Sequence, residues 1–443
     1  MLKIYQTESA QKTILNRVPL DDFDVSPWLH ESIQKVFGAS LTPEEAVRKV
    51  LREIRSKGDA ALQKWAKKID GFESSDFQVP EEDITESYGK ITGNERKALM
   101  VSADRIRRFF SAQPLSSWSF KDGNGTLGMV VRPIQRVGIY VPGGTASLAS
   151  SVLMSAIPAQ VAGVKEIVLV VPPQKETREI APIILAAAEI LGIKEVYMLG
   201  GAQAIGALAF GTESIPAVDK IFGPGNIFVT LAKRQVFGVV GIDGLAGPTE
   251  TMVIADETAN PTWVAADLLA QAEHDILASA ILLTSSMKLA KAVQKAVRQQ
   301  LSTLPREEII SKSLSANSGI ILTESLEESI AVANMYAPEH LCLSIKDAMT
   351  VVKKITAAGG IFVGDYSCEV LGDYVAGPSH VMPTSGTARF ASALNVLDFV
   401  HLVNLAALDD QTAISLCDSA AVIARSEGLE AHARAADARK GSA

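Results

Sequence analysis

Residues 247–275 of this 443-residue chain read Gly-Pro-Thr-Glu-Thr-Met-Val-Ile-Ala-Asp-Glu-Thr-Ala-Asn-Pro-Thr-Trp-Val-Ala-Ala-Asp-Leu-Leu-Ala-Gln-Ala-Glu-His-Asp. The apolar run 252–255 follows a Gly-Pro turn and predicts a buried strand. Asn260 and Pro261 then predict the start of a helix, because Asn caps helices and Pro fits the first helical position. The stretch therefore contains a complete strand–loop–helix unit.

The end of this helix carries Gln271 and His274. Residues three apart lie on the same face of a helix. An amide and an imidazole at the end of an apolar stripe form a plausible half of a metal or ligand site. The rest of the chain must supply the other half.

Strands and helices alternate on both sides of this stretch, which predicts βαβ units and parallel sheets. Residues 140–247 form one α/β domain, and a second α/β series begins at 248. Residues 1–40 give no clear sheet, 59–115 read as amphipathic helix, 348–358 as a helix, and 415–439 as one or two helices broken at Gly428. The expected strands are 137–141, 166–171, 195–199, 219–222, 252–255, 280–283, 319–322, 341–345 and 361–363.

The composition indicates an ordinary globular protein, with 47% hydrophobic and 21% charged residues. The formal net charge of -8 argues against a broad nucleic-acid surface. Three widely spaced cysteines without a Cys-x-x-Cys motif argue against a disulfide framework and a thiolate metal site. The polar N-terminus and the lack of a long apolar stretch predict a cytoplasmic protein without membrane segments.

Glu339 and His340 follow Pro338 between a helix and a strand. Loops at sheet edges often carry the sites of α/β proteins, and Glu and His are suited to proton transfer near neutral pH. A helix-end acid beside a capping histidine is the simpler alternative.

Three glycine turns follow predicted strands, at 143–144, 200–201 and 223–225. The chain contains neither a G-x-G-x-x-G nor a phosphate-loop motif. The helix N-termini after these turns favour a dinucleotide, since such termini bind pyrophosphate. Tight strand-to-helix turns without a ligand remain the alternative.

Gln271, His274, Asp373 and His432 form a nitrogen and oxygen ligand set without thiolate. Such a set suits zinc, cobalt or manganese, with positions left for substrate. The four residues span a large part of the chain, so spacing alone does not bring them together.

Several motifs taken together resemble the histidinol dehydrogenase family. They occur in family order from about Val130 to the tail, and the set is specific although each motif is weak singly. They are Tyr140-Val-Pro-Gly-Gly, Gly200-Gly-Ala-Gln-Ala-Ile, Phe222-Gly-Pro-Gly-Asn, Ala246-Gly-Pro-Thr-Glu, Asp267-Leu-Leu-Ala-Gln-Ala-Glu-His, Ala337-Pro-Glu-His-Leu, Gly372-Asp-Tyr, His380-Val-Met-Pro-Thr and Glu427-Gly-Leu-Glu-Ala-His.

The resemblance implies NAD-dependent, four-electron oxidation of L-histidinol to L-histidine through L-histidinal, with one zinc ion per subunit. It implies that Glu339 and His340 transfer protons. The implied zinc ligands are Gln271, His274, Asp373 and His432, the implied substrate contacts are these four with Thr249, His340 and Glu427, and the implied NAD contacts are Tyr140, Gln203 and Asn226. His380 is given only a supporting role.

The resemblance also implies an architecture. Two Rossmann-like αβα domains with parallel-type sheets lack the usual glycine fingerprint, and small helical segments lie at both termini. The expected parts are an N-terminal segment 1–36, a main metal and substrate domain 37–139 with 248–394, an NAD-binding domain 140–247, and a helical tail 395–443. The family forms a homodimer whose tail crosses to the partner subunit, so Glu427 and His432 would complete the partner's site.

Two departures from the family are visible. Thr249 stands where the family often has Ser, which keeps the hydroxyl. After His274, Asp-Ile-Leu replaces the Asp-Pro or Gly-Pro that is common there. Two other functions stay open: a related zinc and NAD dehydrogenase of another polar alcohol, such as a sulfonated diol, and a non-catalytic α/β binding protein.

Overall fold

The computed structural model describes residues 2–17, 27–74, 76–143 and 147–440. It divides into two compact units, each described here by itself. The first unit comprises Met1–Ala112 and Gln135–Asn395, and the second comprises Gln113–Ile134 and Val396–Ala443.

A six-stranded, all-parallel sheet forms one half of the first unit, in the order β1-β11-β10-β9-β12-β13. The central strands β9 and β10 are buried along their whole length, which explains why they read as continuous apolar runs. The strands are β1 Lys3–Gln6, β9 Glu250–Ala255, β10 Ser279–Thr284, β11 Gly319–Leu322, β12 His340–Ser344 and β13 Gly360–Val363.

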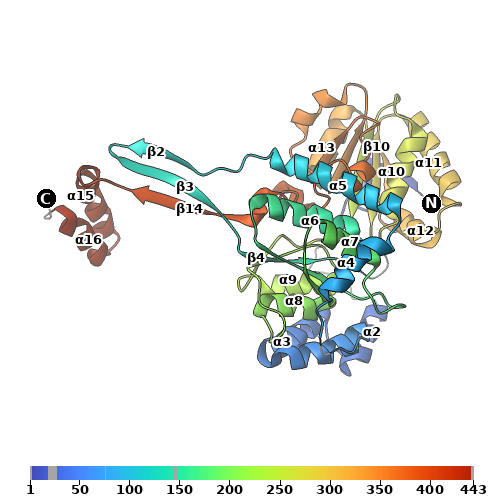
Figure 1. The fold of residues 1–443 in the computed structure, drawn as a ribbon. Coiled ribbons are helices and arrows are strands. Elements are labelled where there is room, and N and C mark those ends of the chain that lie inside the picture. The colour runs from blue at the N-terminus through green and yellow to red at the C-terminus, as the bar shows by residue number, and fades with distance from the viewer. Residues whose placement is uncertain (1, 18–26, 75, 144–146, 441–443) are drawn as a thin grey trace. The chain divides into compact units, whose positions relative to one another are not determined.

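Helices cover both faces of this sheet (Figure 1). Val253 of β9 points into a core shared with α10, α11 and α12, while its neighbours Met252 and Ile254 point into a core with α1 and α13. This alternation follows from the two-residue period of a strand. The helices are α1 Thr7–Gln11, α10 Pro261–Ala272, α11 Met287–Leu301, α12 Glu307–Ala316, α13 Leu326–Tyr336 and α14 Glu369–Tyr374.

A second parallel sheet of the first unit has the order β6-β5-β4-β7-β8. On one face α3 packs against α8 and α9, whereas α6 packs against α5 and α7. The elements are β4 Arg136–Tyr140, β5 Glu166–Val171, β6 Glu195–Met198, β7 Lys220–Phe222, β8 Gly241–Ile242, α2 Pro27–Phe37, α3 Pro43–Trp65, a π-helical turn Ala66–Asp70, α4 Glu81–Lys90, α5 Gly93–Ser111, α6 Ala149–Ala162, α7 Pro182–Ile190, α8 Gly201–Phe210 and α9 Ile227–Val236.

The second unit consists of an antiparallel sheet in the order β14-β3-β2 and a helical hairpin, α15 with α16 (Figure 1). Its elements are β2 Trp118–Asp122, β3 Gly125–Pro133, a 3-10 turn Val396–Phe399, β14 Val400–Ala407, α15 Asp410–Ser426 and α16 Glu430–Lys440. The break between the two helices falls at Gly428, which adopts a φ of 77°.

The two parallel sheets with helices on their faces confirm the predicted α/β class. Four local predictions were wrong. Strand β1 lies within the first 40 residues, where no sheet was expected, and it pairs with β11. Residues 348–358 form two 3-10 turns, Ala348–Thr350 and Val352–Lys354, because Asp347 takes a left-handed φ of 54°.

The other two corrections concern the segment 59–115 and the strand that precedes the helices of the tail. The segment 59–115 is not one helix, because it contains the end of α3, the π-helical turn, α4 and α5, with a loop before α4. The tail contains β14 in addition to its two helices. None of the helices in the described ranges is long and apolar enough to cross a bilayer.

Candidate active site

Glu339 and His340 lie where the chain enters β12, at the amino end of the strand. Strand β9 runs parallel beside it, with His340 in register with Thr251, so the loop that leads into β9 reaches the same edge. Ala337 ends α13 with a left-handed φ of 50°, which turns the chain toward Glu339. A non-glycine residue in that conformation is uncommon and often marks a functional site.

The carboxylate of Glu339 is buried and held from two sides. Thr249 Oγ1 donates to Glu339 Oε2 at 2.6 Å, and the backbone N–H of Glu250 donates to the same oxygen at 3.0 Å. Two donors on one oxygen fix the orientation of the carboxylate.

Both ring nitrogens of His340 have polar neighbours. Nε2 lies 3.3 Å from Asp373 Oδ1, while Nδ1 lies 2.9 Å from Gln271 Nε2 and 3.2 Å from the carbonyl oxygen of Glu250. Phe362 stacks on the ring with centroids 5.8 Å apart. The ring is therefore held between the end of α10, the start of β9 and α14.

The charges around His340 favour its protonated form. Burial by itself lowers the pKa of this imidazole, but the charge of Glu339, 3.5 Å away, and the hydrogen bond to Asp373 outweigh burial and raise the pKa well above its usual value. Burial likewise raises the pKa of Asp373, yet the hydrogen bond to His340 lowers it below its ordinary value. These neighbours stabilise the imidazolium once His340 has taken a proton, so abstraction of a proton must start from the neutral ring.

Helix α10 delivers the two residues with which the sequence argument began. Gln271 is buried in the last turn and contacts His340. The helix ends at Ala272, and His274 follows, with its backbone N–H donating to the carbonyl of Gln271 at 3.2 Å. The exposed His274 faces a cavity.

This cavity, of about 500 Å³, lies in the first unit and connects the end of α10 with the second sheet. Tyr140, Gly143, Gly200, Gly201 and Asn226 line it, so all three predicted glycine-turn regions meet there. Gly144 of the first turn lies outside the described residues. An elongated ligand bound here would reach His274, and a cavity of this size is typical of small-molecule sites.

The three predicted NAD residues occupy different positions. The Tyr140 hydroxyl accepts a hydrogen bond from the N–H of Gly201 at 3.2 Å, and the Asn226 side chain caps α9. Gln203 is fully buried and donates to Asp70 Oδ2 at 2.8 Å, and Asp70 lines the cavity. Gln203 does not itself line this cavity, and its side chain reaches the cavity wall only by its hydrogen bond to Asp70.

The sequence model of the histidinol dehydrogenase family matches residues 38–440. The chain belongs to the histidinol dehydrogenase family. It is accordingly an oxidoreductase with histidinol dehydrogenase activity. This finding confirms both the resemblance and the predicted activity. The family uses NAD.

Similar proteins cover nearly all of the chain. A histidinol dehydrogenase of Deinococcus radiodurans is 45% identical over 436 residues, which are 98% of this chain and 98% of that protein. One of Thermus thermophilus is 46% identical over 399 residues, which are 90% and 95% of the two chains. The crystal structure of histidinol dehydrogenase from Elizabethkingia anophelis has a TM-score of 0.90 at 36% identity, covering 99% and 98%.

The remaining site residues of the family motifs, Glu427 and His432, lie in the second unit. Glu427 caps the C-terminus of α15 and His432 lies in the first turn of α16, both exposed. Their role as substrate and metal contacts stays a prediction. His380 supports Asp373, since its Nδ1 lies 2.9 Å from the Asp373 carbonyl oxygen and its Nε2 3.3 Å from Ser151 Oγ.

The sequence reasoning missed two residues that hold this edge of the sheet together. Glu250 offers its backbone N–H to Glu339 and its carbonyl to His340. Its side chain is bound by Arg17, with contacts of 2.6 and 2.7 Å, and burial raises the pKa of Glu250 to about 7 although Arg17 lowers it. A charged residue at the start of an apolar strand was the available signal for Glu250, whereas nothing near Arg17 pointed to it.

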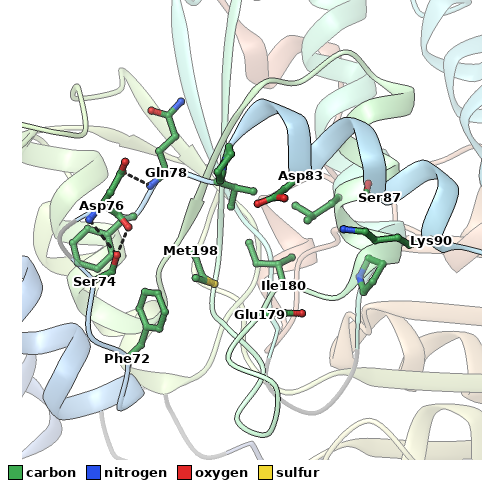
Figure 2. Close-up of a pocket in the computed structure, with 15 residues that line it drawn as sticks. Phe72, Ser74, Asp76, Gln78, Asp83, Ser87, Lys90, Glu179, Ile180 and Met198 are labelled. Carbon is green, nitrogen blue, oxygen red and sulfur yellow. Dashed lines mark hydrogen bonds between the residues drawn. The ribbon is translucent and has the colours of Figure 1, made fainter.

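A second cavity, of about 440 Å³, lies apart from this site (Figure 2). It opens between the segment before α4 and the segment before α7, and Asp76, Asp83 and Glu179 give it an acidic lining. No predicted site residue lines it.

Proposed function

We propose that this protein oxidises L-histidinol to L-histidine through L-histidinal, with two successive hydride transfers to NAD and with Glu339 and His340 as the proton carriers. The observation that supports this most directly is the buried pair itself. One carboxylate and one imidazole face the same edge of the sheet, each oriented by two or more hydrogen-bonding neighbours. Such preorganised acid–base pairs are what a two-step alcohol oxidation requires.

The first step removes two hydrogens from the alcohol carbon and oxygen. The hydroxyl proton passes to His340 as the hydride leaves the carbon for the nicotinamide ring, which gives the aldehyde. The acceptors that surround the ring, Glu339 and Asp373, stabilise the extra proton on His340.

The second step requires water. Glu339 takes a proton from the water that attacks the aldehyde carbon, while His340 returns its proton to the carbonyl oxygen. The product is a hydrate with two hydroxyl groups, and His340 is neutral again. His340 then takes a proton from one hydroxyl while a second hydride leaves for a second NAD, which gives the carboxylic acid. Thr249, bound to Glu339, keeps the carboxylate directed at this position.

The predicted zinc ligands suit the metal in donor type. Among the described residues no three His, Cys, Asp or Glu side chains gather to hold a metal. The four predicted zinc ligands would not form such a group, because Gln271 contributes an amide and His432 belongs to the second unit. Gln271 and Asp373 converge on the two sides of the His340 ring, and His274 lies near enough to lower the pKa of Asp373. Bound zinc would hold the imidazole and the amine of the substrate and so orient its alcohol carbon.

The large cavity supports the NAD assignment. It brings Tyr140 and Asn226 together at the N-termini of α8 and α9, where backbone N–H groups favour phosphate. It also reaches His274, so a dinucleotide bound along it would place one end beside the predicted substrate site.

A homodimer is supported by the surface of the second unit. Its three-stranded sheet has two edges, β14 and β2, that are unpaired within the described residues. Trp118 and Phe120 stack on each other and are each 53% exposed, and Leu402, Val422 and Ile423 are exposed as well. Apolar side chains and open strand edges of this extent are covered by a partner in stable proteins. The proposed partner is a second copy of the chain, whose Glu427 and His432 complete the site. The proposed location of the enzyme is the cytoplasm.

One assay tests the reaction. The amount of NADH formed per mole of L-histidinol is measured with and without a chelator. We expect two NADH per substrate and loss of turnover after metal removal, restored by zinc. Turnover of another polar alcohol with no turnover of L-histidinol would contradict the proposed reaction. Full turnover of L-histidinol by the metal-free protein would refute the zinc site but not the reaction.

A further inference from the structure

Glu369 is a buried carboxyl that the proposed reaction does not use. It is the first residue of α14 and is only 1% exposed. Thr251 Oγ1 donates to its Oε2 at 2.6 Å, and the thiol of Cys342 lies 3.8 Å from the same oxygen. Its other oxygen, Oε1, is buried with no hydrogen-bond partner in the described part of the chain.

No ion pair among the described residues compensates this carboxyl. The titratable groups that face it are His340 and Cys342 from β12, Asp267 from α10 and Asp373 from its own helix, and it takes part in none of the ion pairs of the described residues. Burial raises the pKa of Glu369 to about 8, although His340 and Thr251 lower it. A carboxyl in these surroundings is uncharged at neutral pH.

The position of Glu369 determines where α14 sits. Glu369 and Asp373 are four residues apart and so lie on one face of this short helix. Asp373 is the residue that contacts His340 Nε2. The far end of α14 is held separately, since Arg105 Nε donates to the carbonyl of Val375 at 2.6 Å.

Packing around Gly372 leaves the helix no room to shift. A Cβ atom at Gly372 would come within 2.3 Å of the Phe362 ring, and Phe362 stacks on His340. A small displacement of α14 therefore moves both Asp373 and the ring that supports the catalytic imidazole. Interiors are close-packed, so such displacements are transmitted rather than absorbed.

We propose that Glu369 is a positioning residue, an uncharged anchor that ties α14 to Thr251 of β9 and thereby sets Asp373 against His340. It does not take part in proton transfer, because its bonded oxygen faces Thr251 and Cys342 and neither oxygen bonds to His340. The inference rests on the proposed roles of Asp373 and His340.

Two pairs of variants separate anchoring from charge. Glu369→Gln keeps the shape and the acceptor oxygen but cannot ionise, whereas Glu369→Ala removes the anchor. Thr251→Ser keeps the hydroxyl on the other side of the bond, and Thr251→Val removes it. Glu327→Ala is the matched control, an exposed first-turn acid of α13.

We expect Glu369→Ala and Thr251→Val to lower kcat by about 10- to 100-fold and to release zinc to a chelator faster, as for residues that orient a metal ligand. Glu369→Gln, Thr251→Ser and the control should stay within about twofold of wild type in kcat and zinc release, with an unchanged pH profile. Should Glu369→Ala fail to fold, the Thr251 pair decides.

Equal losses in Glu369→Gln and Glu369→Ala would overturn the proposal, because they would show that the charge is required. Unchanged kcat and zinc release in both Glu369→Ala and Thr251→Val would overturn it as well. Zinc release is measured without turnover. A wild-type protein that retained zinc but did not oxidise L-histidinol would therefore refute the proposed reaction while leaving this measurement informative.

Discussion

Thr249 donates its hydroxyl hydrogen to Oε2 of Glu339 over 2.6 Å, so the residue that precedes β9 orients the carboxylate that precedes β12. Thr249→Val keeps the size of the side chain and removes this bond. A hydrogen bond to a charged group contributes about 1.5–3 kcal/mol, so we expect kcat/KM for L-histidinal to fall by roughly 10- to 100-fold. Steady-state NADH formation measures the change.

Thr249→Ser is the matched variant, since it keeps the hydroxyl and removes only a methyl group. It should retain most of the wild-type activity. Loss of activity in Thr249→Ser comparable to that in Thr249→Val would mean that packing of the methyl group, and not the hydrogen bond, determines the effect.

Glu339→Gln and His340→Asn should affect the two oxidation steps differently. The proposed sequence uses His340 in both hydride steps and Glu339 only when water attacks the aldehyde. We expect His340→Asn to lower turnover of both L-histidinol and L-histidinal by about 100-fold or more, in the range of general base catalysis. Glu339→Gln should lower L-histidinal oxidation by a similar factor and leave the first hydride transfer largely intact.

Single-turnover measurement with each substrate separates these effects from product release. The role assignment fails if Glu339→Gln slows both substrates equally or if His340→Asn slows neither. Circular dichroism of both variants should match that of the wild type, because each substitution is close to isosteric.

The elements that were predictable from the sequence are those whose environment is uniform along their length. Strand β9 is buried on both faces, so it reads as an apolar run, and α10 has both a capping Asn260 and Pro261 at its start. Strand β14 gave no such signal, because seven of its eight residues are exposed and its partner β3 lies far away in the sequence. The formation of β14 depends on its pairing with β3, and the sequence around β14 alone does not show that pairing.

Asn226 has two roles that substitution can separate. Its side chain lines the large cavity and also caps α9 by accepting from Phe228 and Val229. Loss of an N-cap costs about 1 kcal/mol. We therefore expect Asn226→Ala to lower thermal stability slightly and to raise KM for NAD several-fold, as measured by NAD titration at saturating L-histidinol.

Ser286→Ala is the control for capping alone, since Ser286 caps α11 and does not line that cavity. It should lower stability by a similar amount with KM for NAD unchanged. A KM for NAD in Asn226→Ala equal to that of Ser286→Ala would remove Asn226 from the NAD site.

Asp267 should make stability depend on pH. Burial, with the nearby charge of Asp365, raises the pKa of Asp267 from its ordinary value of 3.8 to about 6. Well below pH 3.8 the group is protonated in both the folded and the unfolded state. Between pH 4 and 6 the folded state binds the proton more tightly, so this contribution to stability is lost as the pH rises through that window.

Asp267→Asn does not titrate, so the variant should gain stability relative to the wild type as the pH rises from 4 to 7, by up to about 3 kcal/mol. Denaturant unfolding at several pH values measures the difference. Asp104→Asn, at an exposed position of α5, should show no such trend. A constant difference for Asp267→Asn across this range would contradict the pKa of the folded state.

The candidate site likewise combines residues that are adjacent in sequence with contacts between residues far apart in sequence. Glu339 and His340 are adjacent in sequence and were found from residue type alone. Arg17 contacts Glu250 and the backbone carbonyl of Tyr336 across more than 230 residues of sequence, and its guanidinium lies 3.6 Å from the Tyr336 ring centroid. Only the folded chain shows that the N-terminal segment links β9 and α13, the two elements beside Glu339 and His340.

Mixing two inactive variants tests whether the tail acts on the partner subunit. His340→Asn disables the site built from the first unit, and His432→Ala disables the contribution of the second unit. If the tail crosses, a mixed dimer contains one site with both defects and one with neither, so activity returns after the variants are unfolded and refolded together. If each tail serves its own subunit, every site in the mixture keeps one defect and no activity returns. Each variant refolded alone is the control, and we expect activity only in the mixture.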